Sequence, residues 1–572
     1  MELEVQKAQT TTPTASLLAR IARHPQWLGA GVIVIAFLLL ILAINPVHEF
    51  PVEDDWDYSK TVWNVLQTGA FHRLEVTQAT VFFPALWGAL FSKLFGYSLT
   101  TLRASTLVLA VSTLLFFYAL LGELEFDVPR RVLATLSLML APAFVYLAFS
   151  FMTDVPLFFC ILAALYFYMR AWRSNNLLFA VLASIFAALG FLARQVGALV
   201  PISFALFVLL YGRNTKIPLW KWIASGVIIP LLVVSAYLAW SQFFGGANWA
   251  DRARTLTGTI GFWFQLDTPG VFVRRYAVAT ATLGIYILPL WLAVYPALFQ
   301  VRDAWQNTPR LAKLLVALVT LLSIIALVRA ATRYEWFPYL TDILTRAGMR
   351  PYLAFFAEGW GYHRPLIFSD AASAILTLLA GAIGIVLSAL IIGRWGKPFS
   401  PPLALIYLTT LILALASLTF FTYFERYLLP LLPGVIILLL DVTRRVRVSI
   451  LAGAVGLIVV ALFSIALMQD YFAWNQVRWD AGRDLLTHGA PVERIDGGYE
   501  WNGWHLYDAS VAFIRAQNVP MTIDPWKYIL DPQYMFTFQP VPDYHIMQEY
   551  PFATPLRAGG TDKLYLLERN SN

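Results

Sequence analysis

The chain has 572 residues, of which 59% are hydrophobic and only 13% are charged, and its mean hydropathy is +0.65. This composition excludes a soluble globular protein. The formal net charge of +7 does not indicate a nucleic-acid partner, because most lysines and arginines fall in short loops between apolar segments. Such loops orient membrane proteins and lie in the cytoplasm.

The N-terminal residues 1–26 are polar and predict a cytoplasmic tail. The first apolar segment, residues 27–44, lacks a small-residue cleavage site and is typical of a retained signal anchor. The only cysteine, Cys160, lies in another apolar segment. A disulfide and a cysteine-rich metal site are therefore excluded.

Thirteen apolar segments predict an all-α polytopic membrane protein with about 13 transmembrane helices, since ~20 apolar residues cross the ~30 Å hydrocarbon core. The stretch 81–95 is predicted to lie in the membrane interface instead, with its aromatic residues on one side. With that assignment the basic loops near residues 130, 170 and 445 face the same side, predicted to be the cytoplasm. The predicted spans are residues 27–44, 99–121, 132–149, 154–172, 176–193, 196–211, 220–243, 271–299, 312–329, 370–393, 402–423, 427–441 and 449–469.

The first outer loop, residues 45–98, contains the acidic stretch 53–58 (EDDWDY), with four carboxylates within five residues. Like charges this close repel and raise one another's pKa. One interpretation is a solvated acidic loop at the membrane surface. The other is a catalytic site, in which Asp54 or Asp55 takes up a proton.

Two further charged residues fall at the outer ends of predicted spans. Asp154 precedes Pro156 and is interpreted either as part of a helix cap or as a second acid that faces the same cavity. Arg194 either contacts lipid headgroups or binds a lipid-linked phosphate through both arms of its guanidinium.

Two later observations extend this outer cluster. Arg426 lies between Glu425 and Tyr427, and it either balances Glu425 or binds the phosphate, with Tyr427 as a further substrate contact. Arg103, at the outer start of a span, either extends to the interface or binds the same anion. Carboxylates opposed by arginines near a bilayer surface predict a site for an anionic lipid.

The C-terminal residues 470–572 differ in composition from residues 27–469, because Asp, Gly, Trp and Tyr replace the aliphatic runs. A helix is expected over residues 472–488, and strands over 535–538 and 563–567. We therefore predict a small α/β or α+β domain outside the cytoplasm. Two long outer loops are expected as well, residues 245–270 and residues 330–369, the latter rich in Trp, Tyr and Arg.

Several short motifs resemble GT-C membrane glycosyltransferases, in particular bacterial relatives of dolichyl-phosphate-mannose protein mannosyltransferases and aminoarabinose transferases. The resemblance implies an inverting transfer from a polyprenyl-phosphate sugar, with a first-loop acid as general base. Asp54 and Asp55 match the acidic pair of the family, although Asp-Glu is common there. Tyr58 matches the tyrosine that follows the pair, which implies a substrate contact, and Arg194 and Arg426 match donor-phosphate contacts. The consecutive prolines that often precede the family's juxtamembrane helix are missing. The motifs are residues 54–58 (DDWDY), 65–69 (VLQTG), 82–84 (FFP), 102–105 (LRAS), 153–156 (TDVP) and 425–430 (ERYLLP).

The leading hypothesis is thus a glycosyltransferase of a bacterial plasma membrane that moves a sugar to a glycan, lipid or protein acceptor on the outer side. A transporter or flippase of lipid-linked glycans is the alternative, and a non-catalytic assembly scaffold is a third. A flippase predicts ionisable residues deep within spans, whereas most charges here lie at span ends. No Walker, His-Glu-x-x-His or Gly-x-Ser-x-Gly motif is present, no cofactor is expected, and only a carboxylate-bound divalent cation stays open.

Overall fold

The computed structural model describes residues 25–570 except for 244–267, 297–308, 334, 341, 351–352, 360, 395–398, 421–422 and 523. The predicted tail 1–26 therefore lies almost wholly outside the described residues. The same holds for most of the predicted outer loop 245–270 and for the end of the predicted span 271–299.

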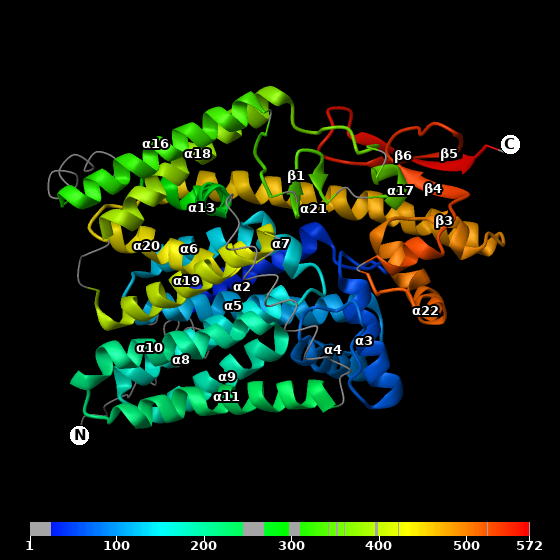
Figure 1. Cartoon of the computed structure of the whole chain (residues 1–572). Coiled ribbons are helices and arrows are strands. Elements are labelled where there is room, and N and C mark those ends of the chain that lie inside the picture. The colour runs from blue at the N-terminus through cyan, green and yellow to red at the C-terminus, as the bar shows by residue number, and fades with distance from the viewer. Residues whose placement is uncertain are drawn as a thin grey trace, which may run out of the picture.

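Long apolar helices form a bundle, and a smaller unit with a β-sheet lies at one end of it (Figure 1). Among the described residues, eight helices are long and apolar enough to cross a membrane. They are α2 (Pro25–Ile44), α5 (Leu99–Glu123), α8 (Asp154–Ser174), α11 (Leu219–Phe243), α16 (Arg310–Thr332), α18 (Asp370–Arg394), α19 (Pro401–Thr419) and α21 (Ile450–Thr487). The membrane part is all-α, as predicted.

The predicted count of about 13 transmembrane helices is not confirmed, because the other five predicted spans form short or broken helices. One of them bends by 67° between α6 (Val128–Leu140) and α7 (Pro142–Ala148), since Pro142 restricts Ala141 to extended backbone and donates no N–H. The remaining pieces are α9 (Leu177–Ala193), η1 (Gln195–Ala198), α10 (Leu199–Tyr211), η2 (Gly212–Asn214), α13 (Thr268–Tyr286), α14 (Leu288–Ala293), η4 (Glu425–Leu431) and α20 (Leu432–Val442).

The basic loops meet at the end of the bundle away from the sheet. Arg130 donates to the carbonyl oxygen of Val446 at 2.7 Å, and Arg444 donates to that of Leu124 at 3.0 Å. At the other end lies α4 (Phe82–Phe95), whose 14 residues extend ~21 Å, too short for the hydrocarbon core. Both observations agree with the predicted placement of 81–95. Which end faces the cytoplasm stays a prediction.

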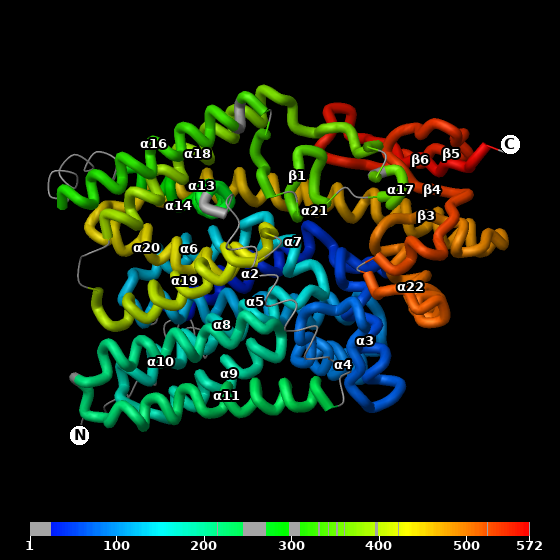
Figure 2. The backbone as a smooth tube through the Cα atoms, in the orientation of Figure 1, coloured from blue at the N-terminus to red at the C-terminus, as the bar shows by residue number. Residues whose placement is uncertain are grey.

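Two segments connect the bundle with the C-terminal unit, and they are named the first and second outer segments after the side predicted for them. The first holds α3 (Asp55–Thr68), which begins within the acidic stretch. The second, after α16, holds β1 (Leu344–Thr345), β2 (Gly348–Met349) and α17 (Phe355–Gly359). Figure 2 shows this second segment beside α21 and close to the C-terminal sheet, and the amide of Ala354 donates to the carbonyl oxygen of Phe536 in that sheet.

The C-terminal unit has a four-stranded mixed sheet with the strand order β3-β4-β6-β5. Strand β3 is parallel to β4, and the other neighbours are antiparallel. The predicted helix 472–488 is the last part of α21, which continues unbroken through the predicted domain boundary at residue 470. The predicted strands 535–538 and 563–567 are confirmed. The elements are η5 (Val492–Arg494), β3 (Ile495–Asp496), α22 (Tyr499–Gln517), η6 (Pro525–Tyr528), β4 (Tyr534–Thr537), β5 (Tyr544–Ala553) and β6 (Thr561–Arg569).

Candidate active site

Asp54 occupies the N-cap position of α3, yet its carboxylate caps no helix N–H. Its two oxygens instead bind side chains from distant parts of the chain. The hydroxyl of Tyr499 donates to Oδ1 at 2.8 Å, and Nη1 of Arg426 contacts Oδ2 at 3.2 Å. The Asp54 side chain remains 22% exposed, so it is accessible to a ligand.

The neighbouring acids point into the protein. Asp55 accepts hydrogen bonds from the amides of Phe151 at 2.8 Å and of Val52 at 3.2 Å. Asp57 accepts one from the hydroxyl of Thr77 at 2.6 Å. Both carboxyl groups are buried. They hold the start of α3 against the neighbouring segments.

These surroundings give the acids different proton affinities. Burial raises the pKa of Asp55 to about 7 and that of Asp57 to about 8. Burial acts on Asp54 in the same direction, but the positive charges of Arg426 and Arg350 and the Tyr499 hydroxyl outweigh it and lower the pKa of Asp54 below its usual value. At neutral pH, Asp54 is therefore fully ionised.

Glu53 is the fourth acid, and it is also buried. It forms ion pairs with Arg426 at 2.6 Å and with Arg350 at 3.1 Å. Burial raises the pKa of Glu53, and the positive charges of Arg350 and Arg426 act against that shift. Its backbone has a φ of 55°, which is uncommon for a residue other than glycine. The two ion pairs hold it in this conformation.

Arg426 is the centre of the cluster. Besides Glu53 and Asp54 it faces Asp342, whose Oδ2 lies 3.8 Å from its Nε. The expected alternative of a balance between Arg426 and Glu425 is wrong, because Glu425 accepts a hydrogen bond from the amide of Leu344 at 3.0 Å. Arg426 lies in η4 directly before Tyr427.

Asp154 and Arg194 form a second ion pair, 2.5 Å long. Asp154 is the first residue of α8, where a negative charge interacts favourably with the helix dipole. Thr153 holds the N-cap position but makes no capping hydrogen bond with its side chain. The Asp154 carboxylate binds Arg194 rather than the helix end, so the cap interpretation does not account for it.

The two groups of charges adjoin each other. The Arg194 guanidinium lies over the ring of Tyr427, 5.4 Å from its centre, and Asp154 interacts electrostatically with Arg426. Tyr58 is buried within the electrostatic range of Asp54, Arg194 and Arg426. The structure therefore brings together seven of the eight residues expected at the site, with Asp55 behind the others.

Arg103 is the exception. Its guanidinium donates to the carbonyl oxygens of Pro46 at 2.7 Å, His48 at 3.1 Å and Phe50 at 3.0 Å. Those bonds hold the start of the first outer loop, and the side chain is buried. The structure does not turn Arg103 toward Arg426 and Asp54.

Four members of the cluster were not expected from the sequence as site residues. They are Glu53, Asp342, Arg350 and Tyr499. The loop that carries Asp342 and Arg350 was recognised only by its content of Trp, Tyr and Arg. The acidic stretch itself pointed to Glu53, whereas no local pattern distinguished Tyr499 from the other aromatic residues of the C-terminal unit.

Some buried carboxylate oxygens of the cluster lack a hydrogen-bond donor among the described residues. Within the part of the chain that the structure describes, Oε2 of Glu53 and Oδ2 of Asp154 are buried and accept no hydrogen bond. Buried polar atoms are usually paired with protein or water. Over the same residues, no group of three or more His, Cys, Asp or Glu side chains is arranged to hold a metal ion.

Comparison with known proteins gives one family match. Residues 82–240 match the model of the family described as dolichyl-phosphate-mannose-protein mannosyltransferase. No curated protein matches the chain.

Several solved structures are similar, among them the following two. ArnT from Cupriavidus metallidurans, bound to undecaprenyl phosphate, is 11% identical, with 87% of this chain and 84% of that chain covered and a TM-score of 0.39. The archaeal oligosaccharyltransferase AglB from Archaeoglobus fulgidus, in complex with an inhibitory peptide and a dolichol-phosphate, is 16% identical, with 89% of this chain and 60% of that chain covered and a TM-score of 0.40.

The matched residues include α4, Asp154 and Arg194, and they carry several of the motifs on which the expectation rested. The chain thus resembles the GT-C membrane glycosyltransferases, as its motifs predicted, through the dolichyl-phosphate-mannose-protein mannosyltransferase pattern of residues 82–240.

Proposed function

We propose that this protein is a membrane glycosyltransferase that moves a sugar from a polyprenyl-phosphate donor to an acceptor hydroxyl, with Asp54 as general base. The observation that carries the proposal is the position of the Asp54 carboxylate, which is partly exposed and in contact with Arg426 and Tyr499. Its lowered pKa favours the ionised form that a base requires. The family match of residues 82–240 supports the same class of enzyme.

The reaction is a single displacement at the anomeric carbon. The Asp54 carboxylate takes the proton of the acceptor hydroxyl while the acceptor oxygen forms a bond to that carbon. The bond between the anomeric carbon and the phosphate oxygen breaks, and its electron pair leaves with the polyprenyl phosphate. Attack from the face opposite the leaving group inverts the configuration. The proton then passes from Asp54 to water.

Arginines stabilise the departing phosphate. Arg426, Arg350 and Arg194 come from three parts of the chain that are far apart in the sequence. Guanidinium groups bind phosphate oxygens with two parallel hydrogen bonds. In the structure these arginines are held by Glu53, Asp342 and Asp154. The acids set the positions of the arginines before the donor arrives, so little reorganisation is needed during the reaction.

A lipid-linked donor fits the position of this cluster. Asp54 lies at the start of α3, and α3 lies at the end of the bundle where the apolar helices give way to the C-terminal unit (Figure 1). A polyprenyl phosphate presents its phosphate at such a boundary, while its hydrocarbon tail stays in the bilayer. The same end is the predicted outer face, where nucleotide sugars are not normally available.

The proposal is tested with the purified protein in proteoliposomes that also contain total membrane acceptors. Sugars labelled with ³H are supplied either on polyprenyl phosphate or on a nucleoside diphosphate. We expect label in the acceptor fraction and release of free polyprenyl phosphate with the lipid donor alone. Label that crosses the bilayer while still on its lipid, without transfer, would instead identify a flippase.

A further inference from the structure

We infer that Tyr499 is a positioning residue, supplied by the C-terminal unit, whose hydroxyl fixes the orientation of the Asp54 carboxylate. This inference rests on the proposed function, since it assigns a task to Tyr499 through the proposed base. It also makes the C-terminal unit a component of the active site rather than an appendage.

Two side chains contact the Asp54 carboxylate directly. Arg426 contacts Oδ2 and the Tyr499 hydroxyl donates to Oδ1. Arg426 has further acids to bind, Glu53 and Asp342, so its position depends on several charges at once. The Tyr499 hydroxyl, by contrast, contacts Asp54 directly and defines where the second oxygen lies. A proton acceptor needs such a fixed direction toward the hydroxyl that it deprotonates.

The position of Tyr499 is itself well determined. It is the first residue of α22 and follows Gly498, whose φ of 91° lies in the left-handed region that favours glycine. Its ring packs edge-on against Trp526, with ring centres 5.4 Å apart, and against Trp56 of α3 at 6.1 Å. Trp56 directly follows Asp55, so the same packing connects Tyr499 with the acidic stretch.

Buried charges hold the backbone on both sides of Tyr499. Arg478 of α21 donates to the carbonyl oxygen of Gly497 at 2.9 Å and forms an ion pair with Glu500 at 3.1 Å. Asp496 accepts hydrogen bonds from the amides of Phe355 and Phe356 in α17, at 2.9 and 3.0 Å. The turn before α22 is thereby attached both to the long helix and to the second outer segment.

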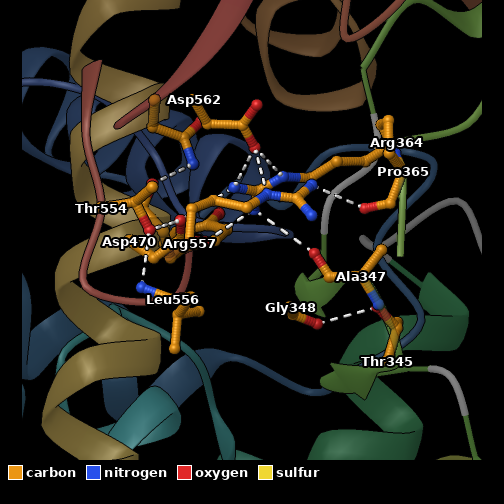
Figure 3. Close-up of polar contacts among 12 residues, drawn as sticks. Thr345, Ala347, Gly348, Arg364, Pro365, Asp470, Thr554, Leu556, Arg557 and Asp562 are labelled. Carbon is orange, nitrogen blue, oxygen red and sulfur yellow. Dashed lines mark hydrogen bonds and ion pairs between the residues drawn. The ribbon is translucent and has the colours of Figure 1, made fainter. Parts of the chain in front are cut away.

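That second outer segment is in turn anchored by a buried ion cluster (Figure 3). Arg364 binds both oxygens of Asp470 in α21, at 2.6 and 2.8 Å, and also Asp562 of β6 at 3.0 Å. The Thr554 hydroxyl donates to Asp470 at 2.5 Å. These contacts connect the sheet, α21 and the second outer segment, which carries Arg350. They thereby stabilise the arrangement in which the Tyr499 hydroxyl contacts Asp54.

Charged and titratable groups from several elements surround Asp54. The Tyr499 hydroxyl differs from the arginines among its neighbours because it donates its hydrogen bond to Asp54 as a neutral group. Removal of its hydroxyl changes no formal charge, which makes its contribution separable. The groups are Glu53, Asp55, Asp57 and Tyr58 around α3, Asp342 and Arg350 in the second outer segment, Arg426 in η4, and Asp154 and Arg194, which act on Arg426.

The test is the pH dependence of kcat/KM for Tyr499→Phe in proteoliposomes. A base must be deprotonated to act, so kcat/KM falls at low pH, along the acidic limb of the profile. Because the lost hydrogen bond had stabilised the ionised carboxylate of Asp54, the pKa of Asp54 should rise in the variant. The acidic limb should therefore move to higher pH. A hydrogen bond to a charged group corresponds to a shift of about one to two pH units. The matched control is Tyr507→Phe, also on α22, whose hydroxyl accepts from the amide of Glu75 at 2.9 Å. This control should leave the limb unchanged.

An unshifted acidic limb in Tyr499→Phe overturns the inference, and the proposed function then still stands if Asp54→Asn is inactive. A fully active Asp54→Asn overturns the proposed function itself. If Tyr499→Phe does not fold, 3-fluorotyrosine is incorporated at position 499. Its more acidic hydroxyl is a stronger donor, so the limb should move downward, and an unmoved or raised limb would overturn the inference.

Discussion

Replacement of Arg364 by methionine should destabilise the C-terminal unit severely. The guanidinium and the Asp470 carboxylate are both fully buried, and methionine fills similar space without a charge. After the change, Asp470 retains the hydrogen bond from the Thr554 hydroxyl but loses both hydrogen bonds from the guanidinium. Removal of one partner from a buried ion pair costs ~3–5 kcal/mol, because the other charge stays behind unpaired.

The matched control is Arg557→Met. Arg557 contacts Asp562 at 3.1 Å and donates to the carbonyl oxygens of Leu366 and Pro365, but its side chain is 23% exposed. Its removal leaves an acid that water can reach, so the loss of stability should be smaller than for the fully buried Arg364. The double variant Arg364→Met/Asp470→Leu removes both buried charges and should recover much of the loss.

The assay is thermal unfolding in lipid nanodiscs, followed by tryptophan fluorescence. We expect a much lower Tm for Arg364→Met than for Arg557→Met, and an intermediate Tm for the double variant. If Arg364→Met unfolds at the same temperature as Arg557→Met, the buried cluster does not hold the C-terminal unit in the way inferred from its geometry.

Three further changes test other contacts. Arg426→Gln should weaken the affinity for polyprenyl phosphate by about 10- to 100-fold, since it removes a charge-assisted hydrogen bond; an unchanged Kd would exclude Arg426 as a phosphate ligand. Gly503→Ala should cost ~1–3 kcal/mol by overpacking, because the added Cβ would lie 2.5 Å from the Trp56 ring; an unchanged Tm would mean that α22 does not rest on α3. Glu425→Gln should alter the pH dependence of stability, since burial raises the pKa of Glu425 to about 8. Between its usual pKa and about 8 the folded state keeps a proton that the unfolded state releases, so the unfolding free energy of the wild type should fall relative to Glu425→Gln as the pH rises. Parallel stability curves would contradict the raised pKa.

The sequence predicted the part of the site that follows from local charge patterns. A carboxylate or a guanidinium next to an apolar segment is conspicuous in a chain with so few charges, and this identified Asp54, Asp154, Arg194 and Arg426. All four lie at the same end of the bundle, because each stands at the boundary of an apolar helix and the spans fix which boundaries face each other.

The choice between Asp54 and Asp55 could not be made from the sequence. It depends on the amide of Phe151, which binds Asp55, and on Tyr499, which binds Asp54. Both partners are remote in the chain. The part played by Arg103 was equally hidden, because its ligands are backbone carbonyl oxygens that no side-chain pattern reveals.

The second outer segment was the largest omission. Asp342 and Arg350 lie near two short strands and a five-residue helix, so no apolar periodicity marks which side chains face the acids. The predicted number of spans is not confirmed, for a related reason. The stretch 132–149 is apolar enough to be taken for a single span, but it bends at Pro142. The stretches 176–193 and 196–211 form apolar helices that are shorter than the other spans.

The central claim is that an ionised Asp54 accepts the proton during sugar transfer, and a pair of matched variants tests it most directly. Asp54→Asn and Asp57→Asn are compared with the wild type for transfer of label from a polyprenyl-phosphate sugar. Asparagine at position 57 can still accept the hydrogen bond from Thr77, so Asp57→Asn should remain within a few-fold of the wild type. We expect Asp54→Asn to lose about 10²- to 10⁴-fold in kcat, and equal rates for the two variants would contradict the assignment of Asp54 as the base.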